Sequence, residues 1–331
     1  MIGSTKERKS LMLKRTSKDH GTIRIGITQG EISGISPEII AKTLDFFNDD
    51  KTIELYVIAD KEAELEIKAN LKSPLSKHII FNNPDYSKIP EQIKNCPELS
   101  CVYCASMLSV NGELEAIVTA PVDKNKTSKK YPHFSGHTGF LKEILQTEQV
   151  LMLMVTPSFK IGIMTEHVPL KEVINYISKE RIISSVDLLN SYLKSTKTEP
   201  VIGVLALNPH SGDSGLVGRE EIDIIVPAIK ELNSMGIKAI GPIPGDTAFV
   251  SPVKERCDGT LAMYHDQGMI PAKIKGFDSL VNVTLGLPII RTSPGHGVAY
   301  DIKGKGTASP NSMIKAVNQA IDMVLAERIS K

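Results

Sequence analysis

Short runs of apolar and β-branched residues alternate along the chain with longer stretches in which apolar residues recur every three or four positions. The short runs are typical of strands, and the longer stretches are typical of amphipathic helices. Strands that alternate with helices predict an α/β fold with substantial parallel sheet. The predicted strands cover residues 22–28, 53–59, 114–120, 201–207, 260–265 and 280–286, and the segments 149–156 and 159–165 look like a strand pair.

Three helices stand out from the same pattern. Ser36 is predicted to cap a helix that begins at Pro37, because serine is a favoured N-cap and proline a favoured first helical residue. Ser309 precedes a C-terminal helix over 310–328 in the same way, and a third helix covers 219–236. No repeat, low-complexity tract or linker divides the chain, so we expect two domains that share a cleft.

The composition is that of a soluble globular protein. The chain has 331 residues, 41% hydrophobic and 23% charged, with a formal net charge of +1. This balance gives no bulk basic field for nucleic acid or an anionic membrane, and no apolar run approaches the roughly 18–20 residues that span a bilayer. Residues 1–20 are basic without a signal-peptide core, so we expect a flexible tail. The lone Cys101-x-x-Cys104 pair favours buried thiols in a cytoplasmic protein over a zinc site.

Three of the predicted strands are followed by histidine, at His167, His210 and His265. The carboxyl ends of parallel strands lie at one edge of a sheet, where ligands bind, so these side chains could converge on one ion. Three nitrogen ligands leave coordination positions open, as a catalytic divalent metal requires. The alternative is that each histidine is an ordinary half-exposed polar residue, and spacing alone leaves both interpretations open.

Other polar residues lie on neighbouring segments. The sequence PHSGDSGLVG at 209–218 is a glycine-rich turn that opens a helix, where backbone N–H groups can meet an anion. Asp246 follows a turn rich in Gly and Pro and could assist a metal or a general base. Lys273, Asn282 and Arg291 follow, and Lys and Arg recognise phosphate or carboxylate. Each alone could be a solvated surface residue, but together they describe a site for a small, doubly anionic substrate.

The chain lacks the usual dinucleotide fingerprints. No G-x-G-x-x-G follows a predicted strand, and no G-x-x-x-x-G-K-[ST] occurs. A different glycine-rich stretch, SPGHGVAYDIKGKGTASP at 293–310, combines turn glycines, a histidine, an acid and a helix start. It could hold a phosphate, or it could be a plain connector.

Longer motifs bring in a resemblance. TAPVDKNK at 119–126 is similar to T-A-P-[IV]-[ND]-K, and FSGHTGFL at 134–141 to P-G-H-T-E-F-L. LNPHSGDSGLVGREE, GPIPGDTAF, MYHDQG and VNVTLGLPIIRTS are similar to further motifs of the same family, in the same order. The sequence resembles the 4-hydroxythreonine-4-phosphate dehydrogenases of vitamin B6 biosynthesis from about residue 22 to 328.

The resemblance implies an isocitrate/isopropylmalate dehydrogenase-like fold, with two α/β/α domains around a central cleft. It also implies a homodimer whose active site lies at the subunit interface and takes metal ligands from both chains. The family's metal ligands fall on His167, His210 and His265, and its substrate-binding positions on His137, Thr138, Lys273, Asn282 and Arg291. The stretch at 293–310 resembles the segment that cradles the adenosine half of NAD in isopropylmalate enzymes, which implies cofactor contacts at His296, Asp301, Gly304 and Gly306.

We expect the first domain, with the cofactor loop, to comprise residues 21–125 and 266–331. The second domain, with the metal ligands and the dimer interface, would comprise residues 126–265. The chain departs from the family pattern G-D-P-A-G-I-G-P-E, because Glu31, Ile32, Ser33 and Ser36 replace Asp, Pro, Ala and Gly. Gly139 and Gly295 replace acids in two other motifs. These departures are expected to bear on substrate detail and cofactor preference rather than on the chemistry itself.

The implied function is the NAD-dependent oxidation of 4-phosphohydroxy-L-threonine to 2-amino-3-oxo-4-phosphooxybutanoate, which decarboxylates to 3-amino-2-oxopropyl phosphate. The implied cofactors are NAD and a divalent metal, zinc or alternatively Mg, Mn or Co. Asp246 and Lys273 are the candidate catalytic residues. Three alternatives stay open: a family member that oxidises 4-phospho-D-threonate or 4-phospho-D-erythronate, a non-catalytic phosphate-binding homologue, and an acyl transferase to phosphate that would bind coenzyme A.

Overall fold

The computed structural model describes residues 21–250 and 254–330, and the predicted basic tail at 1–20 lies outside the described residues. The chain divides into two compact units, here termed unit 1 (residues 1–144 and 288–331) and unit 2 (residues 145–287). These boundaries differ from the expected 125/126 and 265/266. Helix α7 (His137–Ile144) packs against a helix of unit 1, and helix α10 (His265–Gly276) packs on the sheet of unit 2, so both segments belong to the unit opposite to the one expected.

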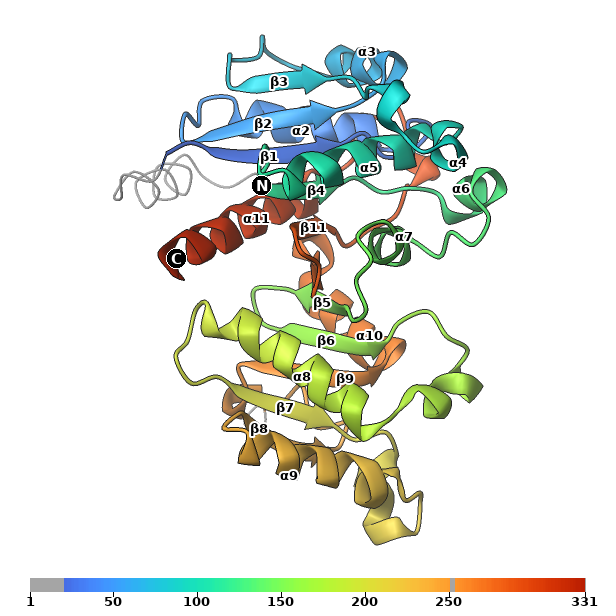
Figure 1. Ribbon diagram of the computed structural model, residues 1–331, viewed down its shortest axis with the longest axis vertical. Coiled ribbons are helices and arrows are strands. Elements are labelled where there is room, and N and C mark those ends of the chain that lie inside the picture. Colours follow the sequence, from blue (N-terminus) through green and yellow to red (C-terminus); the bar gives the residue numbers. More distant parts are fainter. Residues whose placement is uncertain (1–20, 251–253, 331) are drawn as a thin grey trace. The chain divides into compact units, whose positions relative to one another are not determined.

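Unit 1 contains a parallel sheet with the strand order β3-β2-β1-β4-β11 (Figure 1). Every residue of β4 and β11 is buried, which requires helices on both faces of this sheet. The chain runs from β1 outward through β2 to β3 and then returns to β4 on the other side of β1. The carboxyl ends of β1 and β4 therefore border the topological switch point, where α/β sheets bind ligands. The strands are β1 (Ile23–Thr28), β2 (Ile53–Ile58), β3 (Ile79–Asn82), β4 (Ala116–Thr119) and β11 (Ile290–Pro294).

The helices of unit 1 cover this sheet. Helix α5 packs against β1, β2 and β4, while α11 packs against β11, β4 and β1 and also contacts α2. The helices are α2 (Ser36–Phe47), α3 (Lys61–Ala69), α4 (Glu91–Lys94), α5 (Pro97–Val110), α6 (Lys124–Lys130), α7 and α11 (Asn311–Ser330), and the short turns are η1 (Tyr86–Lys88) and η7 (Tyr300–Ile302).

The two predicted caps in unit 1 have different outcomes. Ser309 accepts a hydrogen bond from the Asn311 backbone N–H at 3.3 Å, as expected at the start of α11. Ser36 is the first residue of α2, and Ile35 occupies the cap position without a side-chain hydrogen bond. The Ser36 hydroxyl instead donates to the Pro121 carbonyl at 3.1 Å. The prediction for Ser36 was wrong because a tertiary partner, the segment after β4, takes the hydroxyl.

Unit 2 contains a mixed sheet with the order β10-β5-β6-β9-β7-β8. Strands β10, β5 and β6 pair antiparallel, so the strand pair predicted over 149–165 is confirmed, and β6, β9, β7 and β8 run parallel. Strand β8 was not predicted. The strands are β5 (Leu151–Val155), β6 (Lys160–Thr165), β7 (Val201–Leu205), β8 (Lys238–Ile243), β9 (Gly259–Tyr264) and β10 (Val281–Leu285).

Two helices cover opposite faces of this sheet. On β9, a Cβ at Gly259 would meet Leu189 and Leu193 of α8 (Lys179–Lys194), whereas Ala262 faces Gly268 of α10. Positions 259 and 262 point to opposite faces because strand side chains alternate. The remaining elements are η2 (Leu170–Tyr176), η3 (Pro209–Gly215), the π-helical turn η4 (Glu221–Ile225), α9 (Val226–Ser234), η5 (Lys254–Arg256) and η6 (Phe277–Ser279).

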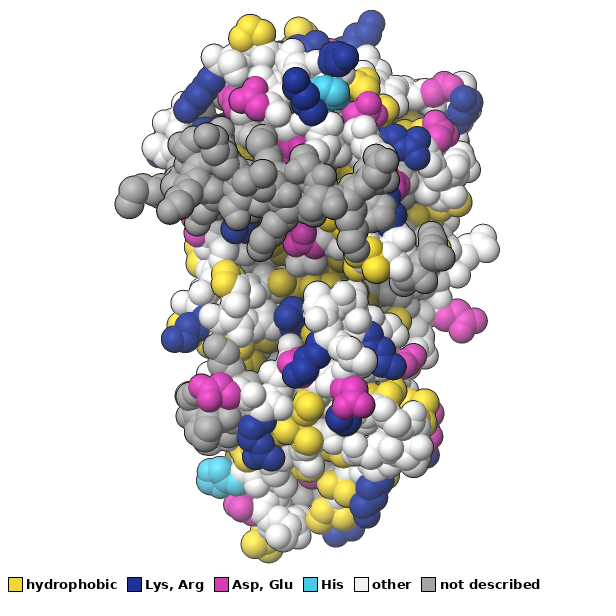
Figure 2. All heavy atoms as spheres, turned by 90° about the vertical axis from the view of Figure 1, so that its left-hand side faces the viewer, with side chains coloured by type: hydrophobic (Ala, Val, Ile, Leu, Met, Phe, Trp, Pro, Cys, Tyr) yellow, Lys and Arg dark blue, Asp and Glu magenta, His cyan; other side chains and the backbone are white. Residues whose placement is uncertain are grey.

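The surface agrees with the balanced composition. On the face that Figure 2 shows, basic and acidic side chains are interspersed, as expected for a net charge of +1. Among the described residues, no helix combines the length and the apolar character needed to cross a bilayer.

Candidate functional site

The three strands that precede the candidate histidines are neighbours in unit 2. β6 pairs in parallel with β9, and β9 pairs in parallel with β7, so their carboxyl ends lie at one edge. The rings of His167 and His265 approach each other there, with centroids 5.4 Å apart. Within the described part of one copy, no group of three or more His, Cys, Asp or Glu side chains is arranged to hold a metal ion. One copy therefore brings two of the predicted ligands together, and the three-histidine set stays a prediction.

His210 lies on an unusual turn beyond β7. Residues 210–214 all have positive φ, between 43° and 79°, and only Gly212 among them is a glycine. Left-handed backbone costs roughly 1–2 kcal/mol for each non-glycine residue, so the surrounding structure must impose it. This turn carries His210 away from the end of β7 and leaves its side chain 71% exposed.

A buried carboxylate holds that turn. Glu221 is 2% exposed and accepts hydrogen bonds from the backbone N–H groups of Leu207 and Asn208, both at 2.8 Å. A Cβ at Gly212 would lie 2.8 Å from Glu221 Oε2, so the turn wraps closely around this carboxylate. Burial alone would raise the pKa of Glu221, but the hydrogen bonds from Asn208 and Leu207 hold it below its usual value. A charged Glu221 therefore fixes the backbone that presents His210.

Each candidate metal ligand has a carboxylate beside its Nδ1 atom. The distances are 3.9 Å from His167 to Glu166, 3.4 Å from His210 to Asp213 and 2.7 Å from His265 to Asp266. Metal-binding histidines commonly have one ring nitrogen on a carboxylate, which orients the ring and raises its basicity. In this arrangement Nε2 is the nitrogen that would meet a metal.

A pocket of about 580 Å³ in unit 2 is lined by both His210 and Asp246. Gln267 joins the strands around it, because its amide accepts from Met263 N–H and donates to the Ala206 carbonyl, both at 2.7 Å. Phe249, Tyr264, Ile270, Pro271 and Ile274 supply apolar lining. The pocket has the character of a ligand site, with convergent polar groups on an apolar wall.

Unit 1 contains a second group of polar residues, on the neighbouring strands β4 and β11. Arg291 is on β11 and only 2% exposed. Its Nε and Nη2 donate to the Thr119 hydroxyl, the last residue of β4, at 3.1 and 2.6 Å. A buried guanidinium is costly unless an anion or hydrogen bonds compensate for its charge.

The positive charge of Arg291 acts on His137, the first residue of α7. Its Nε2 is inaccessible to solvent and has no hydrogen-bond partner among the described residues, although the residue as a whole is only partly buried. Burial, together with the positive charges of Arg291 and Lys124, holds the pKa of His137 well below its usual value. The Lys124 side chain reaches the same loop, because a Cβ at Gly136 would lie 3.6 Å from its Nζ. These residues form a cationic site at the N-terminus of a helix, as an anion requires.

The other predicted substrate-binding residues divide between the units. Thr138 follows His137 on α7 in unit 1, whereas Lys273 is exposed on α10 and Asn282 lies on β10 in unit 2. The Asn282 Oδ1 atom is buried and, like His137 Nε2, has no hydrogen-bond partner among the described residues. Buried polar atoms normally have a hydrogen-bond partner, so a polar ligand at either residue would complete the hydrogen bonds of these atoms.

The predicted cofactor segment is an open loop of unit 1. His296 and the exposed Asp301 lie on this loop, which precedes α11. Gly304 and Gly306 have φ values of 72° and 68°, and nothing lies within 4 Å of the Cβ position of either one. Glycines of this kind allow a ligand to approach the backbone closely.

Two residues of the site were not assigned from the sequence, Thr119 and Lys124. Both lie in the motif TAPVDKNK, so the signal was present without a role attached to it. The carboxylates beside the histidines also had a local signal, because Glu166 and Asp266 are adjacent to His167 and His265 in the chain.

Comparison with known proteins gives a consistent result. Residues 42–320 match the family described as pyridoxal phosphate biosynthetic protein PdxA. The 4-hydroxythreonine-4-phosphate dehydrogenase of Aquifex aeolicus is 38% identical over 91% of this chain and 98% of its own length. A crystal structure of 4-hydroxythreonine-4-phosphate dehydrogenase from Klebsiella pneumoniae matches with a TM-score of 0.77 and 29% identity, over 93% of this chain and 99% of that one. The crystal structure of isocitrate dehydrogenase from Methylococcus capsulatus matches with a TM-score of 0.51 and 13% identity, over 93% of this chain and 89% of that one. This similarity shows a shared fold alone, and it confirms the predicted fold class.

Proposed function

The chain belongs to the PdxA family of pyridoxal phosphate biosynthetic proteins, and from this premise we propose that it is a 4-hydroxythreonine-4-phosphate dehydrogenase. Its reaction would oxidise the hydroxyl of 4-phosphohydroxy-L-threonine and transfer a hydride to NAD, after which the β-keto acid loses CO2. The observation that carries the proposal is the cationic site of unit 1, in which the buried Arg291 and the exposed Lys124 both act electrostatically on His137, whose Nε2 has no hydrogen-bond partner among the described residues.

That site would bind one anionic end of the substrate. Arg291 is already oriented by Thr119, so an anion there meets a guanidinium that needs little further ordering. His137 Nε2 would supply a hydrogen bond, and Thr138 lies next to it on α7. Lys273 and Asn282 would hold other polar groups of the substrate, and the unpartnered Asn282 Oδ1 supports a ligand at that position.

A divalent metal, zinc or alternatively Mg, Mn or Co, fits the donor set of unit 2. His167, His210 and His265 would hold it, and the carboxylates beside their Nδ1 atoms support this assignment. When bound, such a metal stabilises negative charge that develops on the substrate oxygen during oxidation. Asp246, which shares the pocket with His210, would hold or move a proton at its carboxylate.

We further propose a homodimer that completes this set of ligands. Ile270, Ile274 and Phe277 project from α10 and η6 and are 57%, 73% and 69% exposed. Two of them line the pocket beside His210 and Asp246. Large apolar side chains grouped at a candidate site favour a protein surface that covers them. A partner subunit docked here would bring a second copy of the histidines to the same place.

The loop over 293–310 would bind NAD through His296, Asp301, Gly304 and Gly306. The open glycine positions support this assignment, because they let a dinucleotide approach the backbone. The protein would then supply orientation for hydride transfer, while the cofactor supplies the redox chemistry. Cytoplasmic location stays a prediction.

The decisive test is NADH formation at 340 nm with 4-phosphohydroxy-L-threonine and NAD, with and without a chelator. A rise that chelation abolishes and added metal restores is the expected result. No rise with this substrate, but a rise with 4-phospho-D-threonate or 4-phospho-D-erythronate, would assign the protein to that activity within the family. No rise with any of the three would contradict a dehydrogenase function.

A further inference from the structure

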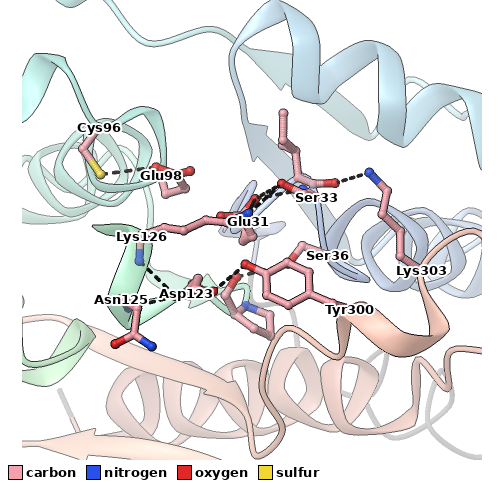
Figure 3. A network of polar contacts seen from close by, with 12 residues as sticks. Glu31, Ser33, Ser36, Cys96, Glu98, Asp123, Asn125, Lys126, Tyr300 and Lys303 are labelled. Atoms are coloured by element: carbon pink, nitrogen blue, oxygen red, sulfur yellow. Dashed lines mark hydrogen bonds and ion pairs between the residues drawn. The ribbon is translucent and has the colours of Figure 1, made fainter. Parts of the chain in front are cut away.

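Three segments of unit 1 that are far apart in the sequence meet beyond the carboxyl ends of β1 and β4 (Figure 3). They are the loop 30–36 that leads into α2, the segment 121–126 at the start of α6, and the loop 296–306 that was assigned above to NAD. The meeting point is the topological switch point of the unit 1 sheet, where α/β folds bind ligands.

The first link is a relay of hydrogen bonds that starts at a lysine. Lys126 Nζ donates to the Ser33 hydroxyl at 3.1 Å, and this hydroxyl donates to Glu31 Oε1 at 2.5 Å. The Ser33 backbone N–H donates to the same carboxylate oxygen at 2.9 Å, and Lys126 Nζ lies 3.5 Å from it. The Glu31 side chain is 5% exposed, so its charge is compensated by these donors rather than by bulk water.

The second link joins the lysine to the predicted cofactor loop. The Tyr300 hydroxyl donates to Asp123 Oδ2 at 2.6 Å, and Lys126 Nζ lies 4.7 Å from the centre of the Tyr300 ring. Asp123 also caps α6, because its other oxygen accepts from the N–H groups of Asn125 and Lys126 at 2.8 and 3.0 Å. The hydrogen bond from Tyr300 and those from the backbone lower the pKa of Asp123, so it is the charged form that caps the helix.

Backbone contacts bring the same loop against the segment before α2. The Val298 carbonyl accepts from the Ile35 N–H at 3.0 Å, and Lys303 Nζ donates to the Ile32 carbonyl at 3.0 Å. A Cβ at Gly34 would lie 2.5 Å from the Val298 oxygen, so the two segments approach as closely as a glycine permits. The side-chain links therefore act on a loop that is already adjacent.

The residues at which the chain departs from the family pattern take part in these contacts. Ser33 stands where the pattern has Ala, and Ser36 where it has Gly, and both use hydroxyls that Ala and Gly lack. Glu31 replaces Asp and accepts the Ser33 hydrogen bonds, while the carbonyl of Ile32 receives Lys303. Glu31 and Ser33, which form one side of the cluster, are thus residues that distinguish this chain from the family pattern.

We propose that Glu31, Ser33, Asp123, Lys126 and Tyr300 form a clasp that positions the loop 296–306 to bind the adenosine half of NAD. The inference rests on the proposed function, because that function assigns this loop to the dinucleotide. A loop that is already ordered loses less conformational entropy when a ligand binds. The clasp residues are positioning residues, so their loss weakens NAD binding and leaves the chemical step and the substrate site unchanged.

The first test is Ser33→Ala, which removes the relay and restores the residue of the family pattern. Calorimetric titration with NAD alone is expected to show a Kd raised roughly fivefold, the scale of one partly exposed charged hydrogen bond. KM for NAD should rise by the same factor, while kcat at saturating NAD and KM for the phosphorylated substrate change by less than about twofold. Ser87→Ala is the matched control, because Ser87 makes the same two contacts to Asp85 on an exposed turn.

The second test asks whether the contacts act as one unit. Lys126→Met and Tyr300→Phe should each weaken NAD binding, and the double variant Ser33→Ala/Lys126→Met should be no worse than the worse single variant. The variants should also be cleaved faster by trypsin after Lys303 or Lys305, without any ligand present. Lys129→Met, on the exposed side of the same helix, should behave as wild type.

The outcomes separate this inference from the proposed function. If the wild-type protein binds NAD and the clasp variants bind it equally well, the clasp is overturned and the cofactor assignment stands. If the wild-type protein binds no NAD, the cofactor assignment fails and the clasp fails with it. A fall in kcat with unchanged Kd for NAD would also overturn the positioning role.

Discussion

The two units present their candidate residues in contrasting ways. In unit 1, Arg291 is buried and oriented by Thr119, and burial together with the charge of Arg291 lowers the pKa of the His137 imidazole. In unit 2, the side chains of His167, His210 and His265 are 49%, 71% and 35% exposed, and only two of these rings approach each other. The proposed anion site of unit 1 can therefore be formed by one chain, whereas the proposed metal site of unit 2 needs residues from more than one copy.

The largest effect is expected from Arg291→Met, which removes the central cation of the proposed anion site in unit 1. Loss of the buried guanidinium should lower kcat/KM roughly 10³-fold, because no other donor of the same geometry replaces it. Arg291→Lys should recover only part of this loss, since an ammonium cannot make the paired contacts to Thr119. Steady-state kinetics would measure both effects.

Two controls make that result interpretable. Arg24→Met changes a partly exposed arginine on β1 of the same unit, which donates to the Gly112 carbonyl, and it should keep full activity. Circular dichroism melting would show whether Arg291→Met is folded at the assay temperature. A folded Arg291→Met enzyme with kcat/KM within tenfold of wild type would show that unit 1 does not bind the substrate anion.

The next largest effect tests the proposed metal site of unit 2, which needs a second copy of the chain. Ile274→Glu places a charge on the exposed apolar face of α10 and should weaken self-association roughly 100-fold, as loss of a central apolar contact does. Metal content and activity should fall with the dimer fraction, because the histidines would no longer meet. Sedimentation velocity and metal analysis on the same samples would measure both quantities.

Leu65→Glu is the matched control for this change. Leu65 lies on α3 of unit 1 and is 70% exposed, against 73% for Ile274, so the two substitutions differ chiefly in location. It should leave the oligomeric state unchanged. A monomeric wild-type protein with full metal content would contradict the proposal that a second copy completes the site.

Local sequence patterns predicted the architecture well. Alternating strand and helix patterns located β1, β2, β4 and most strands of unit 2. The strands that precede the three histidines are adjacent and parallel, as expected, but only the rings of His167 and His265 approach each other in one copy. Periodicity and strand direction are local properties, and the rule that parallel strands share an edge converts them into proximity.

Contacts between residues that are distant in the sequence could not be predicted from local patterns. Arg291 and Thr119 are 172 positions apart, and their hydrogen bonds depend on the pairing of β11 with β4. The position of His210 depends on the buried carboxylate of Glu221, which imposes a left-handed turn that no local pattern predicts. Ser36 was assigned a local role as a cap, but Pro121 takes its hydroxyl. In each case a tertiary partner decided between possibilities that the local sequence left equal.

The smallest effect concerns the charge state of His137, and it sharpens the contrast by testing whether unit 1 is cationic before any ligand binds. The pKa of His137 lies well below 6.5 in the folded protein, because burial, Arg291 and Lys124 all disfavour the imidazolium. The unfolded chain therefore binds a proton near pH 6.5 that the folded chain does not, so this residue costs stability as the pH falls below that value. The loss reaches up to about 2 kcal/mol between pH 6.5 and pH 5, and it vanishes at pH 8.

Urea unfolding at several pH values would measure this effect. The His137→Gln variant should lose less stability than wild type between pH 6.5 and pH 5, while His78→Gln, on the segment before β3, should follow wild type. Parallel pH profiles for wild type and His137→Gln would mean that His137 is protonated freely, and that the site lacks the positive potential on which the anion assignment depends.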